Sequence, residues 1–187
     1  MPKWTREQIV AMVQKGESFS GKDLTETDLS YAFLKGADFS KANLSGCNIQ
    51  NANLERANFK NANLENVFLF GSNLKEANFE GANLRGANLQ DTNLEKARLK
   101  DIDLSGLSLF GAQLNHANLE GADLHDAKLK RANLVGANLR NANLQEVHFQ
   151  RAVLREADLT GADLKGANLK FADLTDARGA NLKGSIQ

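Results

Sequence analysis

Along the chain, every fifth residue from Phe19 to Leu174 is Leu, Phe or Ile, without one exception in thirty-two consecutive positions. A helix repeats its apolar face about every 3.6 residues and a strand every two residues, so neither element explains a strict period of five. The chain is therefore predicted to be a repeat array. A unit of five residues cannot bury its own apolar side chain, so stability must come from stacking the units on one another.

The residues around each apolar centre follow a rule of their own. The position two residues before the centre is Ala in twenty-two of the thirty-two units, and the residue between them is mostly Asn or Asp. Residues two apart point to the same side of an extended segment, so Ala and Leu should both face inward. Twelve of the fifteen glycines stand two residues after a centre, where the third residue of a type II turn needs a positive φ. Short extended pieces joined by corners should therefore wind into a coil with its apolar side inward.

A second period sets the number of corners in each coil. Four of the five central Phe residues are spaced by twenty, namely Phe19, Phe39, Phe59 and Phe79. Four units per coil place these residues in one column, where their rings can stack from rung to rung. We therefore expect four walls and about eight coils of twenty residues. The walls are named by their first centres, as the Phe19, Leu24, Leu29 and Leu34 walls.

The fifth coil departs from the rule for small residues. Ile102 and Leu107 occupy two successive positions at which Ala is usual. Overfilling a packed core costs roughly 1–3 kcal/mol unless the backbone gives way. We therefore expect this coil to be locally widened rather than broken.

The unit Ala-Asn/Asp-Leu/Phe-polar-Gly resembles the repeat of the pentapeptide-repeat family, and the match covers residues 17–177. The resemblance implies an all-β fold, a right-handed quadrilateral parallel β-helix, which is a kind of solenoid. It implies less about function, because the repeat is structural and one fold hosts many functions. Several bacterial members of the family build a dimer interface from a C-terminal segment, and no segment of this sequence matches one.

Residues 1–16 do not follow the repeat and are expected to form an N-terminal capping helix. Thr5 can cap the amide of Gln8 while Gln8 reaches back to Thr5, which is a capping box, and Trp4 can pack on Ile9 as a hydrophobic staple. A helix this short is marginal alone in water, so its apolar face should be buried on the open end of the first coil. The alternative is a helix that binds a membrane surface or a partner.

The repeat is followed by a C-terminal tail over residues 178–187. Gly179 stands where the next apolar centre is expected, and the motif returns out of phase at Leu182. Two arrangements are open: the tail covers the last coil, or that coil is left open for a partner. We expect a monomer, or a weak dimer through the C-terminal end.

Composition narrows the class of protein. The 23 Lys and Arg residues balance the 23 Asp and Glu residues. No apolar run approaches the roughly 20 residues of a membrane-spanning helix, and the N-terminal segment lacks the apolar core of a signal peptide. The one cysteine, Cys47, occupies an inward position and is expected to be buried and structural. A cytoplasmic protein of bacterial type, without membrane association, is the expectation.

Catalytic chemistry has little support in the sequence. The three histidines, His116, His125 and His148, fall on three different walls, so no pair converges on a metal ion or a nucleophile. The sequence has no Ser-His-Asp set and no phosphate-binding glycine loop, and a packed coil offers no cleft. We therefore expect no enzymatic activity, no cofactor and no metal.

The twenty-residue period assigns each outward residue to a wall, and two neighbouring walls stand out. The Leu24 wall, called the acidic wall below, has eight acids against only Arg85 and Lys165. These acids are Asp23, Glu26, Glu65, Asp103, Asp123, Asp126, Glu146 and Asp163. The Leu29 wall, called the basic wall below, has an excess of bases and also breaks the polar rule with outward aromatics. Its candidate partner-binding residues are Phe68, Phe70, Phe110, Lys128, Lys130, Arg131 and Arg151.

Several outward aromatics on one wall indicate an interface. Outward rings can instead fill the space between rungs or, in the case of Tyr31 and Phe33, contact the N-terminal helix. The expected function is a non-enzymatic rigid scaffold for protein–protein interaction, whose unidentified partner has an acidic rim and an apolar pocket. A rigid rod suits this role because it loses little conformational entropy on binding.

An alternative function comes from the resemblance. Family members that confer fluoroquinolone resistance are similar to duplex DNA in width and charge, and they occupy the DNA site of type II topoisomerases. The acidic wall is compatible with such mimicry of DNA, but the balanced total charge argues against it. Direct binding of nucleic acid by the basic wall has weaker support still, because the wall has few bases and no clustered Arg pairs.

Overall fold

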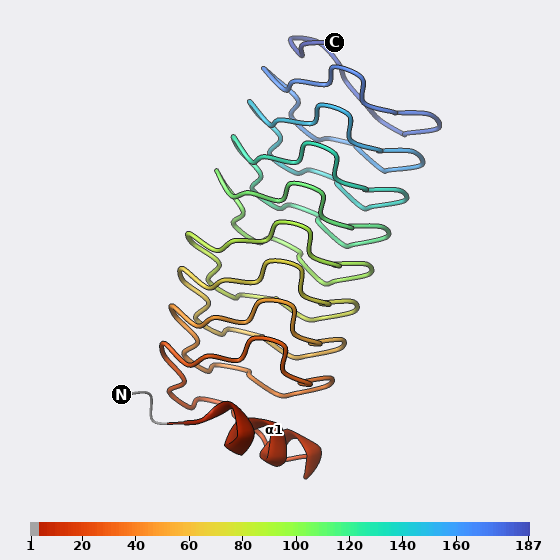
Figure 1. Ribbon diagram of the computed structural model, residues 1–187. Helices are drawn as coiled ribbons and strands as arrows, with labels where there is room; N and C mark the ends of the chain where they lie inside the picture. The colour runs from red at the N-terminus through yellow and green to blue at the C-terminus, as the bar shows by residue number, and fades with distance from the viewer. Residues whose placement is uncertain (1–3) are drawn as a thin grey trace.

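The computed structural model describes residues 4–187 as a rod of stacked coils with one helix at its N-terminal end (Figure 1). Parallel β-bridges join residues that are twenty apart, from Asp23 with Asn43 to Asp158 with Arg178. Each coil is therefore four units long, and the rod is a right-handed quadrilateral β-helix. The fold expected from the repeat is confirmed.

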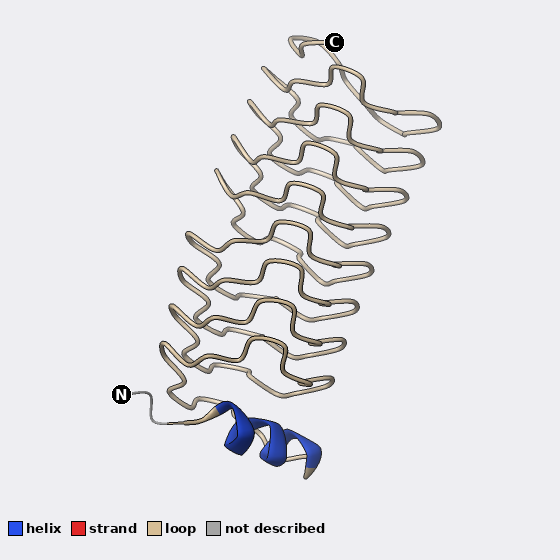
Figure 2. Cartoon of the chain, viewed as in Figure 1, coloured by secondary structure: helices blue, strands red, loops and turns tan. Residues whose placement is uncertain are grey.

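Each rung of a wall contributes a single bridged residue rather than a long strand, so the coils are drawn as loops in Figure 2. The hydrogen bonds between rungs nevertheless form a regular ladder. The backbone N–H of Leu24 donates to the carbonyl of Asn43 at 2.8 Å, and the N–H of Asn43 donates back to the carbonyl of Lys22 at 2.9 Å. This ladder satisfies the backbone of the coils without extended strands.

The corners of the coils are type II turns. At one corner the backbone N–H of Ala32 donates to the carbonyl of Leu29 at 3.1 Å, and the third residue, Tyr31, has φ 59°. Glycine takes this conformation without steric cost, and Asn51 takes it readily with φ 55°. A bulky residue such as Tyr31 pays a conformational cost there, which the packing of the coil must offset.

The core of the rod is a stack of Leu and Ala side chains with one aromatic column. Phe19, Phe39, Phe59 and Phe79 are all fully buried, and their successive ring centroids are 5.5, 5.6 and 5.1 Å apart. The spacing of twenty residues therefore does place them in one column, as predicted. Trp4 extends the column with an edge-on contact to Phe19 at 6.1 Å.

The Asn residues next to the centres have a structural role that explains their frequency. The Asn43 side-chain oxygen accepts a hydrogen bond from the backbone N–H of Ser45 at 3.2 Å, which supports the turn. The same oxygen accepts a second bond at 3.1 Å from the side-chain amide of Asn63 in the next coil. Stacked Asn residues thus form side-chain ladders that link successive rungs.

Helix α1, Arg6–Gln14, lies across the first coil (Figures 1 and 2). Its capping box is formed: the Gln8 N–H donates to the Thr5 hydroxyl at 3.3 Å, and the Thr5 N–H donates to the Gln8 side chain at 2.9 Å. Ile9 is fully buried in the core of the rod. No helix of the described chain has the length and apolarity needed to cross a membrane.

The C-terminal tail continues the coil in a shortened form. Ile186 pairs with Asn168, eighteen rather than twenty residues away, and the Leu169 N–H donates to the Ile186 carbonyl at 2.7 Å. The shortcut passes through Gly179, where a β-carbon would lie 2.5 Å from the α-carbon of Thr160. The tail therefore covers part of the last coil, although Ile186 itself stays 47% exposed.

The fifth coil stands apart from the fourth on one side of the rod, whereas the bulky residues at its small positions predicted a widened coil without a break. Ile102 and Leu107 are both buried, and the corners on the left of Figure 1 are further apart between the fourth and fifth coils than elsewhere. The Leu104 N–H donates to the Asp123 carbonyl at 2.8 Å, but within residues 4–187 the Leu84 N–H has no corresponding bond to the fifth coil. The ladder is thus interrupted on the acidic wall, a detail that the sequence did not predict.

Candidate functional site

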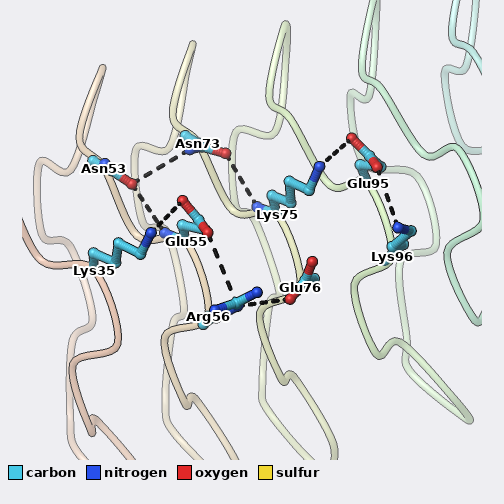
Figure 3. A network of polar contacts seen from close by, with 9 residues as sticks. All are labelled: Lys35, Asn53, Glu55, Arg56, Asn73, Lys75, Glu76, Glu95 and Lys96. Carbon is cyan, nitrogen blue, oxygen red and sulfur yellow. Dashed lines mark hydrogen bonds and ion pairs between the residues drawn. The ribbon is translucent and has the colours of Figure 1, made fainter.

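The Leu34 wall neutralises its own charges by pairing residues of successive coils (Figure 3). Lys35 lies 3.0 Å from Glu55, and Lys75 lies 2.9 Å from Glu95. These pairs are twenty residues apart, so the coil period brings each base beside an acid. Exposed ion pairs contribute little to stability, about 0–1 kcal/mol each, but they pair every base of this wall with an acid.

The Phe19 wall is built in the same way. Lys60 lies 3.3 Å from Glu80, Lys100 lies 3.0 Å from Glu120, and Arg140 lies 3.3 Å from Asp158. Bases and acids alternate along the rod on this wall as well. Most of its charge is therefore satisfied within the rod.

The basic wall lacks such pairing. Its five bases form no ion pair with any carboxylate of residues 4–187; they are Lys128, Lys130, Arg131, Arg151 and Lys170. The Arg151 guanidinium instead lies 5.9 Å from the ring centroid of Phe171. The described chain thus offers these cations no carboxylate, which leaves them available to an external anion.

A groove of about 370 Å³ opens on the basic wall among these bases. It lies between two columns of outward side chains that flank the wall's centres. The residues that line it are Gln90, Ser108, Phe110, Lys128, Lys130, His148 and Gln150. The groove therefore combines an aromatic ring with two free ammonium groups.

Backbone pairing sets the order of residues along the groove. Ser108 is bridged to Lys128, and Lys128 is bridged to His148, so these three occupy one column on successive rungs. In the other column the backbone bonds connect the rungs of Phe110 and Lys130, through Gly111 N–H to the Lys130 carbonyl at 3.2 Å. The groove thus runs along the rod axis, across the rungs.

The structure brings together only part of the predicted partner-binding set. Phe110, Lys128 and Lys130 meet in the groove, whereas Phe68 and Phe70 lie closer to the N-terminus on an earlier rung. Phe68 is 48% exposed and Phe70 is 37% exposed.

Phe110 is less exposed than these two rings: it is partly buried and lines the groove. Arg131 and Arg151 occupy the corner beside the groove, with φ 64° and 60°.

Four residues of the groove were not predicted from the sequence: Gln90, Ser108, His148 and Gln150. The signal was present, because the twenty-residue period places them beside the predicted residues. Among them, Ser108 best indicates where the groove lies. Its side chain is small, whereas the same column holds the large Phe68 and Lys128, so space is left at its rung. The Gln150 side-chain oxygen is buried and has no hydrogen-bond partner, which is costly for a polar atom.

The acids of the acidic wall are partly committed to the coil itself. The Asp23, Asp103 and Asp163 carboxylates each accept a hydrogen bond from the backbone N–H two residues ahead, at 2.9–3.2 Å. Asp123 does the same and also accepts a bond from the Asn143 side chain at 2.9 Å. These four acids thus support turns in the role that Asn has elsewhere, and they keep their negative charge.

The chemistry of the other reactive groups is limited. Among residues 4–187, no three His, Cys, Asp or Glu side chains are grouped so that they could hold a metal ion. Cys47 is fully buried, as its inward position predicted, and its sulfur lies 2.9 Å from the Leu24 carbonyl. Burial raises the pKa of the Cys47 thiol to about 11, so the reactive thiolate is scarce at neutral pH.

Comparison with solved structures finds related repeat proteins. One of them is HetL from the cyanobacterium Nostoc sp. strain PCC 7120, a pentapeptide repeat protein involved in heterocyst differentiation regulation. HetL is 31% identical to this chain, and the alignment covers 98% of this chain and 97% of HetL with a TM-score of 0.42. QnrB1, a plasmid-mediated fluoroquinolone resistance protein, is 22% identical over 88% of this chain and 86% of its own, with a TM-score of 0.43. Rfr23, from the cyanobacterium Cyanothece 51142, is 20% identical over 96% and 97%, with a TM-score of 0.20.

Comparison with proteins of curated function finds no match. Comparison with protein families finds pentapeptide repeats in eight copies, over residues 18–46, 37–75, 69–106, 108–145 and 142–186. These matches span nearly all of the coils, and they agree with the turn geometry and the bridge spacing. The chain belongs to the pentapeptide repeat family.

Proposed function

We propose that this protein is a non-enzymatic, rigid scaffold that binds a protein partner through its basic wall. One observation carries the proposal: the bases of the basic wall stand without acids beside an aromatic groove, while those of the Phe19 and Leu34 walls are largely paired. The coil period could have placed acids beside these bases too, yet all five stand without an ion pair among residues 4–187. An external partner with acidic groups would supply the counter-charges that these bases lack.

The architecture suits binding better than catalysis. The core is a continuous stack of buried Leu, Ala and Phe, so the walls keep a fixed geometry. A fixed surface loses little conformational entropy when a partner docks. Aromatic side chains that are partly exposed, as Phe68 and Phe70 are, commonly supply much of the binding energy at protein interfaces.

A capture experiment with surface variants tests the proposal. The purified protein is immobilised and exposed to extract of its native host, and retained proteins are quantified by mass spectrometry. The variant Lys128→Glu/Lys130→Glu reverses two charges at the groove. The control Arg85→Glu/Lys165→Glu makes the same change in charge on the acidic wall, at bases that also lack ion pairs within residues 4–187.

The proposal expects a protein that wild type and control retain equally and that the groove variant loses by at least about tenfold, which corresponds to ~1.4 kcal/mol. Retention that is equal for all three proteins would contradict binding through the basic wall. The melting temperatures of all three are measured in parallel, so that a loss of folding is not read as a loss of binding.

A second candidate function is mimicry of DNA toward a type II topoisomerase, and the acidic wall is the observation that favours it. The net charge of zero weakens this candidate, because mimicry of DNA calls for acids over much of the surface. Supercoiling by DNA gyrase, measured with rising protein concentration at several salt concentrations, tests it directly. Inhibition or protection that Asp103→Asn/Asp163→Asn removes would favour mimicry over the scaffold.

We also propose a cytoplasmic location and a monomer or weak dimer. A single cysteine that is buried and reduced fits a reducing compartment. Leu174 and Leu182 of the last coil are only partly buried, and Ile186 is exposed, which offers a small apolar surface for weak end-to-end contact. Sedimentation at several protein concentrations, with Ile186→Asp as the comparison, tests the oligomeric state.

A further inference from the structure

We infer that the groove on the basic wall binds an acidic segment of an extended polypeptide, with one apolar side chain of that segment seated against Phe110. This inference rests on the proposed function, which it makes specific: it names the part of the wall and the chemistry of the bound segment. Three features of the groove carry it: its direction, its charge and its aromatic floor.

The direction of the groove suits an extended chain that lies along the rod. From Gln90 to Gln150 the groove crosses three steps between rungs. With ~4.8 Å per step this is roughly 14 Å, which about four residues of an extended chain span at ~3.4 Å each. A volume of about 370 Å³ holds a side chain or two, not a folded domain.

The charge of the groove selects an acidic segment. The Lys128 and Lys130 ammonium groups stand on either side of it, and Arg131 and Arg151 stand at the corner beside it. The acids near them are Asp126, which is 3.3 Å from His148, and Asp91, at the same corner as Arg131 but nearer the N-terminus. Neither acid forms an ion pair with Lys128 or Lys130, so carboxylates placed between the two lysines would find unpaired cations.

The aromatic floor selects an apolar side chain between those carboxylates. Phe110 lies partly buried in the groove, and Ser108 leaves the space beside it open. Gln150 adds a polar contact, because a bound backbone can draw out its amide, whose oxygen is now buried without a partner. A polypeptide supplies the carboxylates, the apolar group and the backbone partner together.

A single-stranded nucleic acid is the competing ligand, since a base could stack on Phe110 while phosphates meet the lysines. The groove favours the peptide for two reasons. The two rings that line the groove, Phe110 and His148, stand in different columns and two rungs apart, whereas successive bases need successive rings. Asp91 and Asp126 stand at its edges, where a continuous line of phosphates would meet them.

Fluorescence anisotropy with a defined probe tests the inference. The probe is the fluorescein-labelled peptide Gly-Asp-Glu-Phe-Glu-Asp-Gly, and its matched controls carry Ala in place of Phe, or Lys in place of each acid. We expect micromolar binding of the probe, at least about tenfold weaker binding of the Ala peptide and no binding of the Lys peptide. An oligothymidine of eight nucleotides tests the nucleic acid.

Three variants of the full chain locate the binding. Ser108→Trp fills the groove at a column position that holds Phe68 two rungs away, so the fold can accept a large side chain there. Lys128→Glu/Lys130→Glu reverses its charge, and Arg85→Glu/Lys165→Glu is the control. The first two variants should lose the probe, and the control should bind it as wild type does.

The outcomes separate this inference from the proposed function. If the probe does not bind, or binds equally to Ser108→Trp and to wild type, the inference is overturned. If the oligothymidine binds more tightly than the probe and responds to the same variants, the groove is a nucleic-acid site and the inference is likewise overturned. If the probe fails but a host protein is still captured in a way that depends on Lys128 and Lys130, the proposed function is kept and only this inference is lost.

Discussion

His148 on the basic wall lies with its Nε2 atom 3.3 Å from Oδ1 of Asp126, which belongs to the acidic wall. The two side chains meet across the corner that the walls share, and both are roughly half exposed. Asp126 is therefore the acid of the neighbouring wall that reaches the groove. Its negative charge opposes an acidic ligand there.

Removal of this charge should strengthen binding. We predict that Asp126→Asn increases affinity for the acidic probe peptide about two- to fivefold, an effect of up to ~1 kcal/mol for an exposed charge, and leaves the melting temperature nearly unchanged. Anisotropy titrations at low and moderate salt measure this. Unchanged or weaker binding would show that Asp126 does not act on the groove.

Helix α1 should protect the open end of the rod. Ile9 is fully buried and Met12 is partly buried against the core, so Ile9→Asp/Met12→Asp places two charges in an apolar contact. We predict a loss of about 3–5 kcal/mol of stability, together with association through the bared first coil. Denaturant titration and light scattering measure the two effects. A double variant that stays monomeric and unfolds like wild type would refute the capping role.

The interrupted ladder should be visible in hydrogen exchange. The Leu64 N–H donates to the Asn83 carbonyl at 2.7 Å, whereas the Leu84 N–H has no such bond among the described residues. We predict that the Leu84 amide exchanges about ten to a hundred times faster than the Leu64 amide. Ile102→Ala/Leu107→Ala restores the usual small residues and should close the gap, which would slow exchange at Leu84. Equal protection of both amides in wild type would contradict the interruption of the ladder between the fourth and fifth coils.

Asp158 should make the rod sensitive to acid. The hydroxyl and N–H of Thr160, with the Arg140 guanidinium nearby, lower the pKa of the Asp158 carboxyl from its usual 3.8 to about 2. A lowered folded-state pKa means that the ionised group stabilises the fold above about pH 4, and that this stabilisation is lost as the pH falls toward 2. Asp158→Asn should therefore be less stable than wild type at pH 6, with the difference shrinking toward pH 2. A difference that does not depend on pH would contradict this assignment.

The fold could be predicted from the sequence because the repeat determines it almost residue by residue. The strict period of the apolar centres fixed the coil, and the spacing of Phe19, Phe39 and Phe59 fixed its four walls. Position within the repeat also predicted the burial of Cys47 and the turn conformation at Asn51. In a solenoid each coil contacts only its neighbours, so local pattern and global fold coincide.

The groove could be predicted only in part, because it depends on side chains from several rungs. The sequence placed Phe110 and Lys128 on one wall, but it did not show that they line one groove together with Ser108. We also did not predict from the sequence which bases form ion pairs. The spacing of twenty residues between Lys35 and Glu55 could have indicated their pairing. The repeat pattern does not indicate the identity of the partner, because the coil needs no particular residue at the outward positions.

The central claim is that the aromatics of the basic wall hold a protein partner, and one comparison tests it most directly. Phe70→Ala/Phe110→Ala removes two rings from the basic wall, and the control Phe33→Ala removes a ring of the Leu34 wall that is 71% exposed. The partly buried Phe110 should make the first variant less stable by about 1–2 kcal/mol, which leaves the rod folded. Capture from extract of the native host, quantified against wild type, should lose the partner with the first variant and keep it with the second. A partner that both variants retain equally would contradict the account and move the interface to another wall, the acidic wall first.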